Sequence, residues 1–204
     1  GERDFMFYRH PGADMLLRPE DVEASADHLR SARAFHFGSL SLISEPSRTA
    51  TLRAAHIARD AGLLISFDPN LRLNLWPSAD AAREGIMLGW QLADVIKVSE
   101  EELAFLTNKD LTGFQNLSGL ASPRLLVVTR GRAGCRFVTP DFAGDVPGFA
   151  VQAVDTTGAG DAFMAALLSR LLKNPAAFES VLALDEVCRF ANAAGALSAT
   201  KRGA

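Results

Sequence analysis

The segment best suited to chemistry in this chain is one in which a carboxylate follows two closely spaced glycines. Residues 155–163 read Asp-Thr-Thr-Gly-Ala-Gly-Asp-Ala-Phe, which places the glycines at Gly158 and Gly160 and the carboxylate at Asp161. Glycine adopts backbone angles closed to other residues and lets a ligand approach the main chain. A carboxylate beside a bound phosphoryl group is suited to accept a hydroxyl proton during transfer. The spacing therefore indicates an anion site with a base attached.

The flanking residues predict that this stretch joins a strand to a helix. Residues 149–154 are rich in strand formers, whereas residues 162–172 are rich in Ala and Leu at helical spacing. Backbone N–H groups at a helix N-terminus lack intrahelical partners and favour a negative charge. An alternative from the residues alone is a plain glycine turn in which Asp161 only caps a helix. A dinucleotide fingerprint is a poor rival, because Phe163 stands where it needs a small residue.

The remaining chain predicts an α/β fold that positions this turn. Strand-like and helical stretches alternate, which favours a mostly parallel sheet with helices on both faces. Ligands bind such sheets at the carboxyl ends of the strands. We expect a single domain over residues 1–204, with strands at 34–38, 63–67, 95–98, 124–129 and 135–138, and helices at 18–33, 44–61, 78–92 and 100–106. Residues 2–9 are also strand-like, and residues 109–123 read as a loop.

Composition excludes several classes of function. The 204 residues carry 21 basic and 24 acidic side chains, a net charge of −3, so there is no basic surface of the kind that nucleic acid requires. No apolar run approaches the roughly 20 residues that span a bilayer, and the start has no signal-peptide layout. The two cysteines indicate reduced thiols rather than a disulfide framework. We expect a cytoplasmic protein with neither nucleic acid nor membrane as a partner.

The run at residues 155–163 resembles the signature of the ribokinase-like (PfkB) carbohydrate kinases. The resemblance implies a ribokinase-like doubly wound fold, with Asp161 as the catalytic base and Gly158, Ala159 and Gly160 forming an anion hole for the transferred phosphoryl group. Residues 5–9, 13–17, 38–42, 73–78 and 97–102 are most similar to the plant-type fructokinases of that family. It therefore implies ATP-dependent phosphorylation of D-fructose to fructose 6-phosphate, with ATP and Mg²⁺ as cofactors.

Two further motifs carry the resemblance to the nucleotide site. Residues 99–102 are similar to the family's Asn-x-x-Glu, which implies a nucleotide contact at Ser99 and a magnesium ligand, through water, at Glu102. Because Ser replaces Asn and Ser-x-x-Glu is also a capping box, a purely structural interpretation stays open. Residues 129–134 are similar to the family's Thr-Leu-Gly-x-x-Gly, which implies ATP contacts at Thr129, Gly131 and Gly134. A hairpin turn is the alternative, and we expect Arg130 to point to solvent.

The resemblance also assigns residues near the C-terminus and around the sugar. It implies that Asn192 faces the adenine, although residues 189–196 also suit close helix packing. It implies a monovalent cation, K⁺, bound largely through backbone oxygens of residues from two segments: Asp155, Thr157, Ser198, Lys201 and Gly203. The resemblance implies that Arg9 contacts the sugar from a sheet that covers the substrate. It also implies a homodimer whose subunits pair through that sheet. Arg72 is a candidate contact for substrate or phosphate, and a buried ion pair with Asp68 is the favoured alternative.

One part of the family pattern is absent from these residues. The family's N-terminal third, with a Gly-Gly pair, an Asn and an early Asp that grip the sugar, has no counterpart in these residues. We therefore expect little activity from this form beside one with an upstream segment. A kinase for ribose or 2-keto-3-deoxygluconate and an inactive fructokinase-like binding protein are the alternatives. A panel of sugars tested for ADP release distinguishes a fructokinase from a kinase for another sugar. An absence of phosphate transfer indicates an inactive binding protein.

Overall fold

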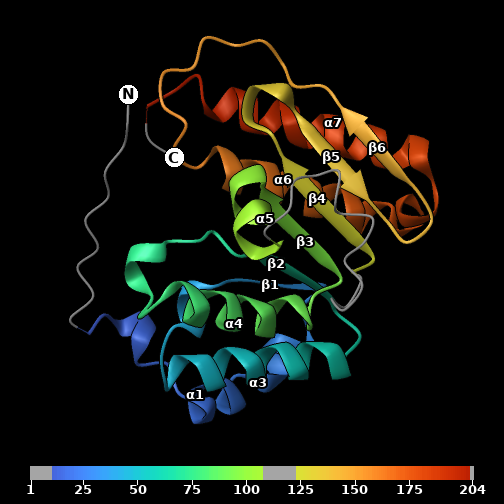
Figure 1. Ribbon diagram of the computed structural model, residues 1–204. Coiled ribbons are helices and arrows are strands. Elements are labelled where there is room, and N and C mark those ends of the chain that lie inside the picture. The colour runs from blue at the N-terminus through green and yellow to red at the C-terminus, as the bar shows by residue number, and fades with distance from the viewer. Residues whose placement is uncertain (1–10, 108–122, 203–204) are drawn as a thin grey trace.

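A twisted sheet forms the centre of the computed structural model, which describes residues 11–107 and 123–202 (Figure 1). Within these residues the strand order is β1-β2-β3-β4-β5-β6. β1 to β4 run parallel, and β4, β5 and β6 pair antiparallel. The strands are β1 Ala34–Gly38, β2 Leu64–Asp68, β3 Val95–Ser99, β4 Leu125–Thr129, β5 Cys135–Val138 and β6 Ala143–Val146. The mostly parallel sheet predicted from the sequence is confirmed.

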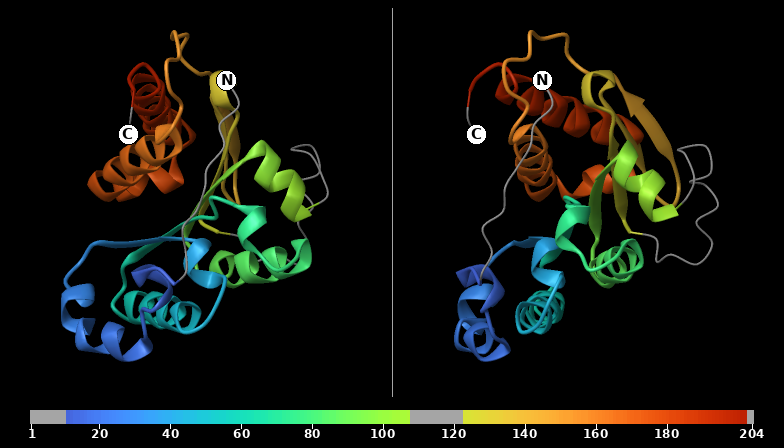
Figure 2. Two further views of the ribbon diagram at one scale, coloured as in Figure 1. Left: turned by 90° about the vertical axis from the view of Figure 1, so that its left-hand side faces the viewer. Right: turned by 60° about the vertical axis from the view of Figure 1, so that its left-hand side comes forward.

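Helices cover both faces of the sheet, as predicted (Figures 1 and 2). One face carries α3 (Ser47–Asp60), α4 (Ala79–Trp90) and α5 (Glu100–Thr107), and the other carries α6 (Ala159–Lys173) and α7 (Val181–Ser198). Two short helices, α1 (Pro19–Ala24) and α2 (Ala26–Arg30), pack against α3. Within the described residues, no helix is both long and apolar enough to cross a membrane.

Strand side chains alternate between two hydrophobic cores. Ile96 and Val98 pack toward the face of α3 to α5, whereas Val95 and Val127 pack toward α6 and α7. Strands buried on both faces are expected to be apolar nearly throughout. Lys97, at the position between Ile96 and Val98, is therefore an exception in a buried strand, and a buried charge requires a partner.

Several elements differ from the sequence prediction. The helix expected at residues 18–33 is broken into α1 and α2 at Ser25, and β6 was not predicted. β1 is only partly buried, unlike β2 to β4. The strand expected at residues 149–154 is wrong: this segment has no regular structure, and Phe149, Val151 and Val154 are exposed. Strand propensity yields a strand only where a neighbouring strand offers partners. Here the backbone N–H of Val154 donates instead to the Ala199 carbonyl at 2.8 Å. The strand-like residues 2–9 lie outside the described part.

Candidate active site

The glycine turn lies at the N-terminus of α6, as predicted. Gly158 takes a left-handed backbone with φ of 73°, which favours glycine, and begins the helix. The first α-helical hydrogen bond runs from Ala162 N to Gly158 O at 2.8 Å. The Ala159 amide donates within the turn to Thr156 O at 3.2 Å. Helix geometry therefore leaves the amides of Gly160 and Asp161 as the donors directed beyond the helix end.

Asp161 stands in the first turn of α6 with an exposed side chain. Its charge acts on two neighbouring groups of the sheet. Burial raises the pKa of Asp68, and the negative charge of Asp161 raises it further. Burial lowers the pKa of His36, a shift that the charge of Asp161 opposes. Asp161 therefore lies near the region of the sheet that carries Asp68 and His36.

A buried ion pair lies beneath the glycine turn. Lys97 Nζ is 2.8 Å from Asp68 Oδ2, and the two side chains are only 9% and 6% exposed. A Cβ placed on Gly160 would stand 3.3 Å from Lys97 Nζ, so the ammonium lies directly against the turn. Sequence reasoning missed Lys97, although a lone lysine within Val-Ile-Lys-Val was a signal. The expected Arg72–Asp68 pair is wrong, because Lys97 occupies Asp68 and Arg72 Nη1 donates to the Leu71 carbonyl at 3.0 Å.

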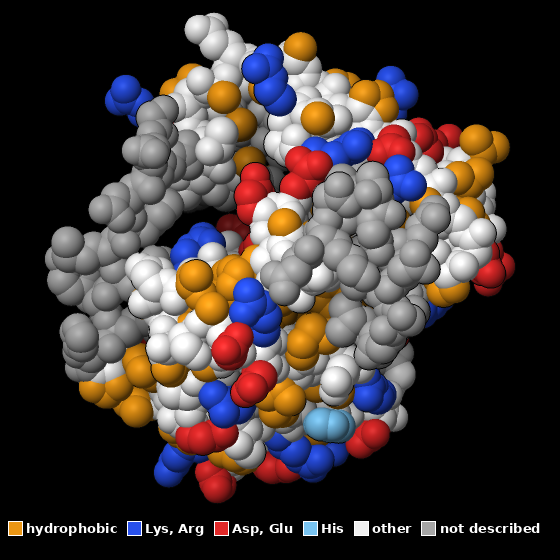
Figure 3. Space-filling view, viewed as in Figure 1, with side chains coloured by type: hydrophobic (Ala, Val, Ile, Leu, Met, Phe, Trp, Pro, Cys, Tyr) orange, Lys and Arg blue, Asp and Glu red, His pale blue; other side chains and the backbone are white. Residues whose placement is uncertain are grey.

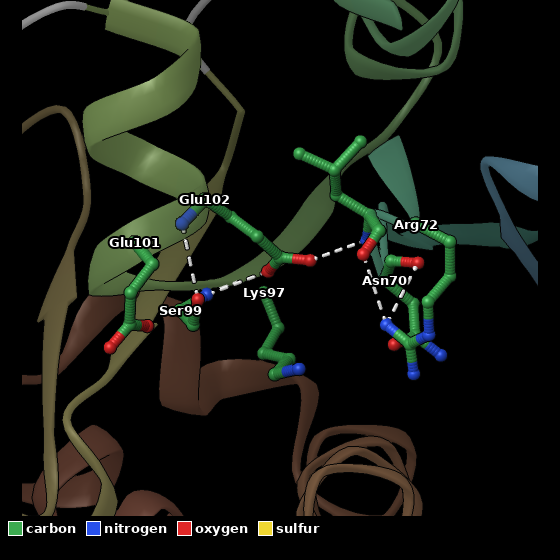
Figure 4. A pocket seen from close by; sticks show the side chains of 7 residues that line it. Asn70, Arg72, Lys97, Ser99, Glu101 and Glu102 are labelled. Carbon is green, nitrogen blue, oxygen red and sulfur yellow. Dashed lines mark hydrogen bonds between the residues drawn. The ribbon is translucent and has the colours of Figure 1, made fainter. Parts of the chain in front are cut away.

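Glu102, in the first turn of α5, connects this helix with the segment after β2 at the carboxyl edge of the sheet (Figure 4). Its Oε2 accepts from Ser99 N at 2.8 Å, and its own N donates to Ser99 Oγ at 3.1 Å, so the capping box is confirmed. Its Oε1 also accepts from Leu71 N at 2.7 Å, which ties the segment after β2 to the start of α5. Among the described residues, no group of three or more His, Cys, Asp or Glu side chains is placed to hold a metal ion.

A pocket of about 330 Å³ opens where β2 and β3 end. Figure 3 shows a recess in the surface with acidic and basic side chains gathered at its margin. Asn70, in the wall of the pocket, has φ of 45°, a conformation that Asn tolerates better than most residues. Both signs of charge meet in the pocket, whose lining is Asn70, Leu71, Arg72, Lys97, Ser99, Glu101 and Glu102 (Figure 4). Such a lining suits a phosphate group with an accompanying cation.

Residues 129–134 form the hairpin between β4 and β5. Arg130 N donates to Gly134 O at 2.8 Å, and Gly131 and Gly134 have φ of 54° and 96°. The hairpin is thus confirmed, and it places Thr129 beside Ser99 in the sheet register. Arg130 does not point freely to solvent as expected, because its Nη1 lies 2.9 Å from Asp145 Oδ1 and its side chain is 21% exposed.

Asn192 holds the end of β6 and the residue after it through side-chain hydrogen bonds. The side chain lies on α7, is 8% exposed, and its Nδ2 donates to the carbonyls of Val146 and Pro147 at 3.2 Å each. Close packing of this helix is confirmed, since a Cβ on Gly195 would stand 3.0 Å from Ala159 O on α6. Asn192 therefore ties α7 to the strand edge near the hairpin.

The residues assigned to a monovalent cation are partly brought together. Asp155 N donates to Ala199 O at 3.1 Å, which places Asp155 beside the end of α7, where Ser198 and Lys201 lie. Asp155 Oδ1 also accepts from Thr157 N at 2.9 Å. Gly203 and the sugar-contact candidate Arg9 lie outside the described residues.

Comparison with known proteins identifies the family. The model of the pfkB family carbohydrate kinases matches residues 1–204. Fructokinase-2 of Oryza sativa subsp. japonica is 52% identical over 206 residues, and probable fructokinase-4 of Arabidopsis thaliana is also 52% identical. Both matches cover all of this chain, which spans only 61% and 63% of those two proteins.

Solved structures agree with this match. Fructokinase from Xylella fastidiosa with bound ATP is 34% identical, with a TM-score of 0.89, over 100% of this chain and 66% of that one. Fructokinase from Vibrio cholerae O395, in a form that binds fructose, ADP and calcium, is 36% identical with a TM-score of 0.83, over 95% of this chain and 61% of that one. By its glycine turn, its sheet and the match of the family model to residues 1–204, the chain belongs to the pfkB family of carbohydrate kinases.

Proposed function

We propose that this protein is an ATP-dependent fructokinase that converts D-fructose to fructose 6-phosphate. The observation that carries the proposal is the position of Asp161. It directly follows a glycine turn whose amides lie at the N-terminus of α6, and a buried ammonium group lies against that turn. That arrangement gathers donors for a phosphoryl group beside a proton acceptor. Fructose is favoured among sugars because the curated relatives that match the whole chain are fructokinases.

The chemistry follows from the geometry of the turn. Asp161 accepts the proton of the primary hydroxyl of the sugar while that oxygen attacks the γ-phosphorus and the bond to ADP breaks. The amides of Gly160 and Asp161 stabilise the negative charge on the transferring group, because they already point there before the reaction. The nucleotide lies along the carboxyl edge of the sheet, with contacts from Ser99, Thr129, Gly131, Gly134 and Asn192.

The donor set around the pocket fits a magnesium ion. Glu102 uses one lone pair of each carboxylate oxygen for a backbone amide and retains others toward the pocket. Magnesium keeps several waters and binds through one or two carboxylates plus substrate phosphates, which suits a water-mediated contact with Glu102. When bound, the ion would neutralise charge on the phosphates. We further propose that K⁺ binds beside the end of α7, largely through backbone oxygens of Asp155, Thr157, Ser198 and Lys201. Gly203, which lies outside the described residues, remains a predicted ligand.

The test is direct measurement of the product. The purified protein is incubated with ATP, Mg²⁺ and fructose, and both ADP and fructose 6-phosphate are quantified, with parallel reactions on ribose, 2-keto-3-deoxygluconate and aminoimidazole riboside. Aminoimidazole riboside is included because a kinase for it from Salmonella enterica is 31% identical, with a TM-score of 0.81. We expect the highest kcat/KM with fructose. A higher value with another sugar would make that sugar the substrate. Because little activity is expected from these residues alone, an inactive binding protein is favoured only if a form that carries an upstream segment also binds nucleotide without any transfer.

Two expectations concern residues outside the described part. Arg9 remains a predicted sugar contact, tested by a rise in the KM for fructose, but not for ATP, in Arg9→Gln. A homodimer formed through the segment that includes Arg9 remains a prediction, tested by the mass of the protein in solution at several concentrations.

A further inference from the structure

A buried lysine and aspartate are an unexpected choice for the interior of this sheet. Lys97 and Asp68 project from adjacent strands onto the face covered by α6 and are almost completely excluded from solvent. Removing two charges from water costs more than their attraction usually returns, so apolar residues of similar volume would often be at least as stabilising. A reason other than stability is therefore needed for this pair.

The surroundings of the pair show what it holds in place. Asp68 uses both carboxylate oxygens: Oδ2 accepts from Lys97 Nζ at 2.8 Å, and Oδ1 accepts from Asn70 N at 3.2 Å. The second bond fixes Asn70 in its left-handed conformation, from which the chain continues to Arg72. Asp68 thus orients both cationic side chains that line the pocket, Lys97 directly and Arg72 through the backbone.

The ammonium group of Lys97 retains N–H donors that are not directed to Asp68 and are available to a ligand. An ammonium group carries three N–H bonds, of which one is directed to Asp68. The group also lines the pocket and lies against Gly160, at the helix end where we place the transferring phosphoryl group. A compact cation held rigidly in a site of low solvent exposure interacts strongly with a phosphate and needs no rearrangement when the charge develops.

We propose that Asp68 is a positioning residue for phosphoryl transfer, which holds the Lys97 ammonium against Gly160 so that it meets the terminal phosphate of the nucleotide. This inference rests on the proposed function, because it takes ATP as the ligand of the pocket. Asp68 itself touches neither substrate. Its contribution reaches the phosphate only through Lys97, which makes the two residues energetically dependent on each other.

That dependence is measured by a double-mutant cycle on nucleotide binding. The variants are Asp68→Asn, Lys97→Met and the double variant, and the probes are AMP and the non-hydrolysable analogue in which an imido group replaces the β,γ-bridging oxygen of ATP. Affinities are measured by calorimetry. Asp94→Asn is the matched control, because Asp94 is also a carboxylate bound to backbone, with Oδ2 accepting from Ile65 N at 2.9 Å, and it precedes β3 at the other end of the strand.

We expect each single variant to weaken binding of the triphosphate analogue by about tenfold or more, the effect of a lost charge-assisted hydrogen bond, while AMP binding changes by less than about twofold. The double variant should bind the analogue as Lys97→Met does, since Asp68 has nothing left to position. The inference is overturned if the two effects multiply, or if Asp68→Asn weakens AMP and the analogue equally.

Two features keep the outcome decisive. If Asp68→Asn fails to fold because it leaves a buried ammonium unpaired, the double variant removes both charges and is expected to fold. Comparing it with Lys97→Met for kcat then tests the same dependence: equal values support the inference, and a further tenfold loss rejects it. Because nucleotide binding needs no turnover, a protein that showed this binding pattern but phosphorylated no sugar would refute the proposed function, whereas the role of Asp68 in holding Lys97 for the terminal phosphate would still be supported.

Discussion

Replacing Gly160 with alanine should separate the activity of this protein from its stability. Gly160 lies inside α6, where alanine is favoured over glycine by about 0.5–1 kcal/mol. The new Cβ would stand 3.3 Å from Lys97 Nζ, the end of a flexible side chain that must yield by a few tenths of an ångström. The gain and the cost are of similar size, so the free energy of unfolding should stay within about 1 kcal/mol of the wild-type value, a shift in Tm of at most about 2–4 °C.

Activity should respond much more strongly. The methyl group would displace the ammonium and occupy space next to the amides of Gly160 and Asp161, where we place the phosphoryl group. Loss of one preorganised donor in sites of this type costs about 10²–10³ in rate. We therefore expect kcat/KM for ATP to fall about a hundredfold, measured by fructose-dependent ADP release alongside thermal unfolding.

Gly62→Ala is the reciprocal control. Gly62 follows α3 with φ of 74° and has nothing within 4 Å of an added Cβ, so alanine there is strained without a clash. It should lower stability by about 1 kcal/mol and leave kcat/KM unchanged. If Gly160→Ala kept kcat/KM within threefold of wild type, no ligand would approach the main chain at that glycine, and our reasoning about the turn would be refuted.

Three further substitutions test other contacts. Gly134→Ala should destabilise by about 3 kcal/mol or more, visible in urea unfolding, because its Cβ would lie 2.1 Å from Val146 O and φ is 96°; a loss under 1 kcal/mol contradicts this. Asn192→Ala should lower the free energy of unfolding by about 1–3 kcal/mol in the same assay, because the carbonyls of Val146 and Pro147 lose their donor. It should also weaken ATP binding. An unchanged unfolding midpoint would contradict the first expectation. Partial desolvation lowers the pKa of His36 below 6.5, although its side chain is exposed to solvent, so the unfolded state binds the proton more tightly. A small part of the stability is therefore lost as pH drops from 6.5 through the folded-state pKa. His36→Gln should reduce that loss, and an unchanged profile of Tm against pH would argue against it.

Much of the fold followed from local patterns in the sequence. The bounds of β1 were predicted to the residue, and the helix expected from residue 78 does begin there, because Ser78 caps α4 by accepting from Ala81 N at 3.1 Å. Parallel strands buried on both faces appear as short, almost uninterrupted apolar runs, and the helices that cover them show a helical spacing of apolar residues, so both can be recognised locally. The segment at residues 149–154 misled because strand propensity does not report whether a partner strand is present.

The site was less predictable where it depends on pairing across strands. The glycine turn is contiguous in sequence, so its position at a helix N-terminus could be inferred. Asp68 was instead assigned to Arg72, four residues away, although its partner Lys97 lies 29 residues further along the chain. The register that places Lys97 beside Asp68 is set by the packing of the whole sheet. Local spacing could not reveal it, just as it could not show that Glu102 binds the backbone of Leu71.

The central claim is that Asp161 acts as the base for a phosphoryl group held at the N-terminus of α6. The most direct measurement compares kcat and the Kd for ATP in Asp161→Asn with those in Asp80→Asn, which removes a carboxylate from the first turn of α4 and so controls for the loss of helix capping. Our account predicts that Asp161→Asn lowers kcat by about 10²–10⁴-fold with little change in the Kd for ATP, and that Asp80→Asn retains wild-type kcat. Near-normal turnover by Asp161→Asn would contradict it.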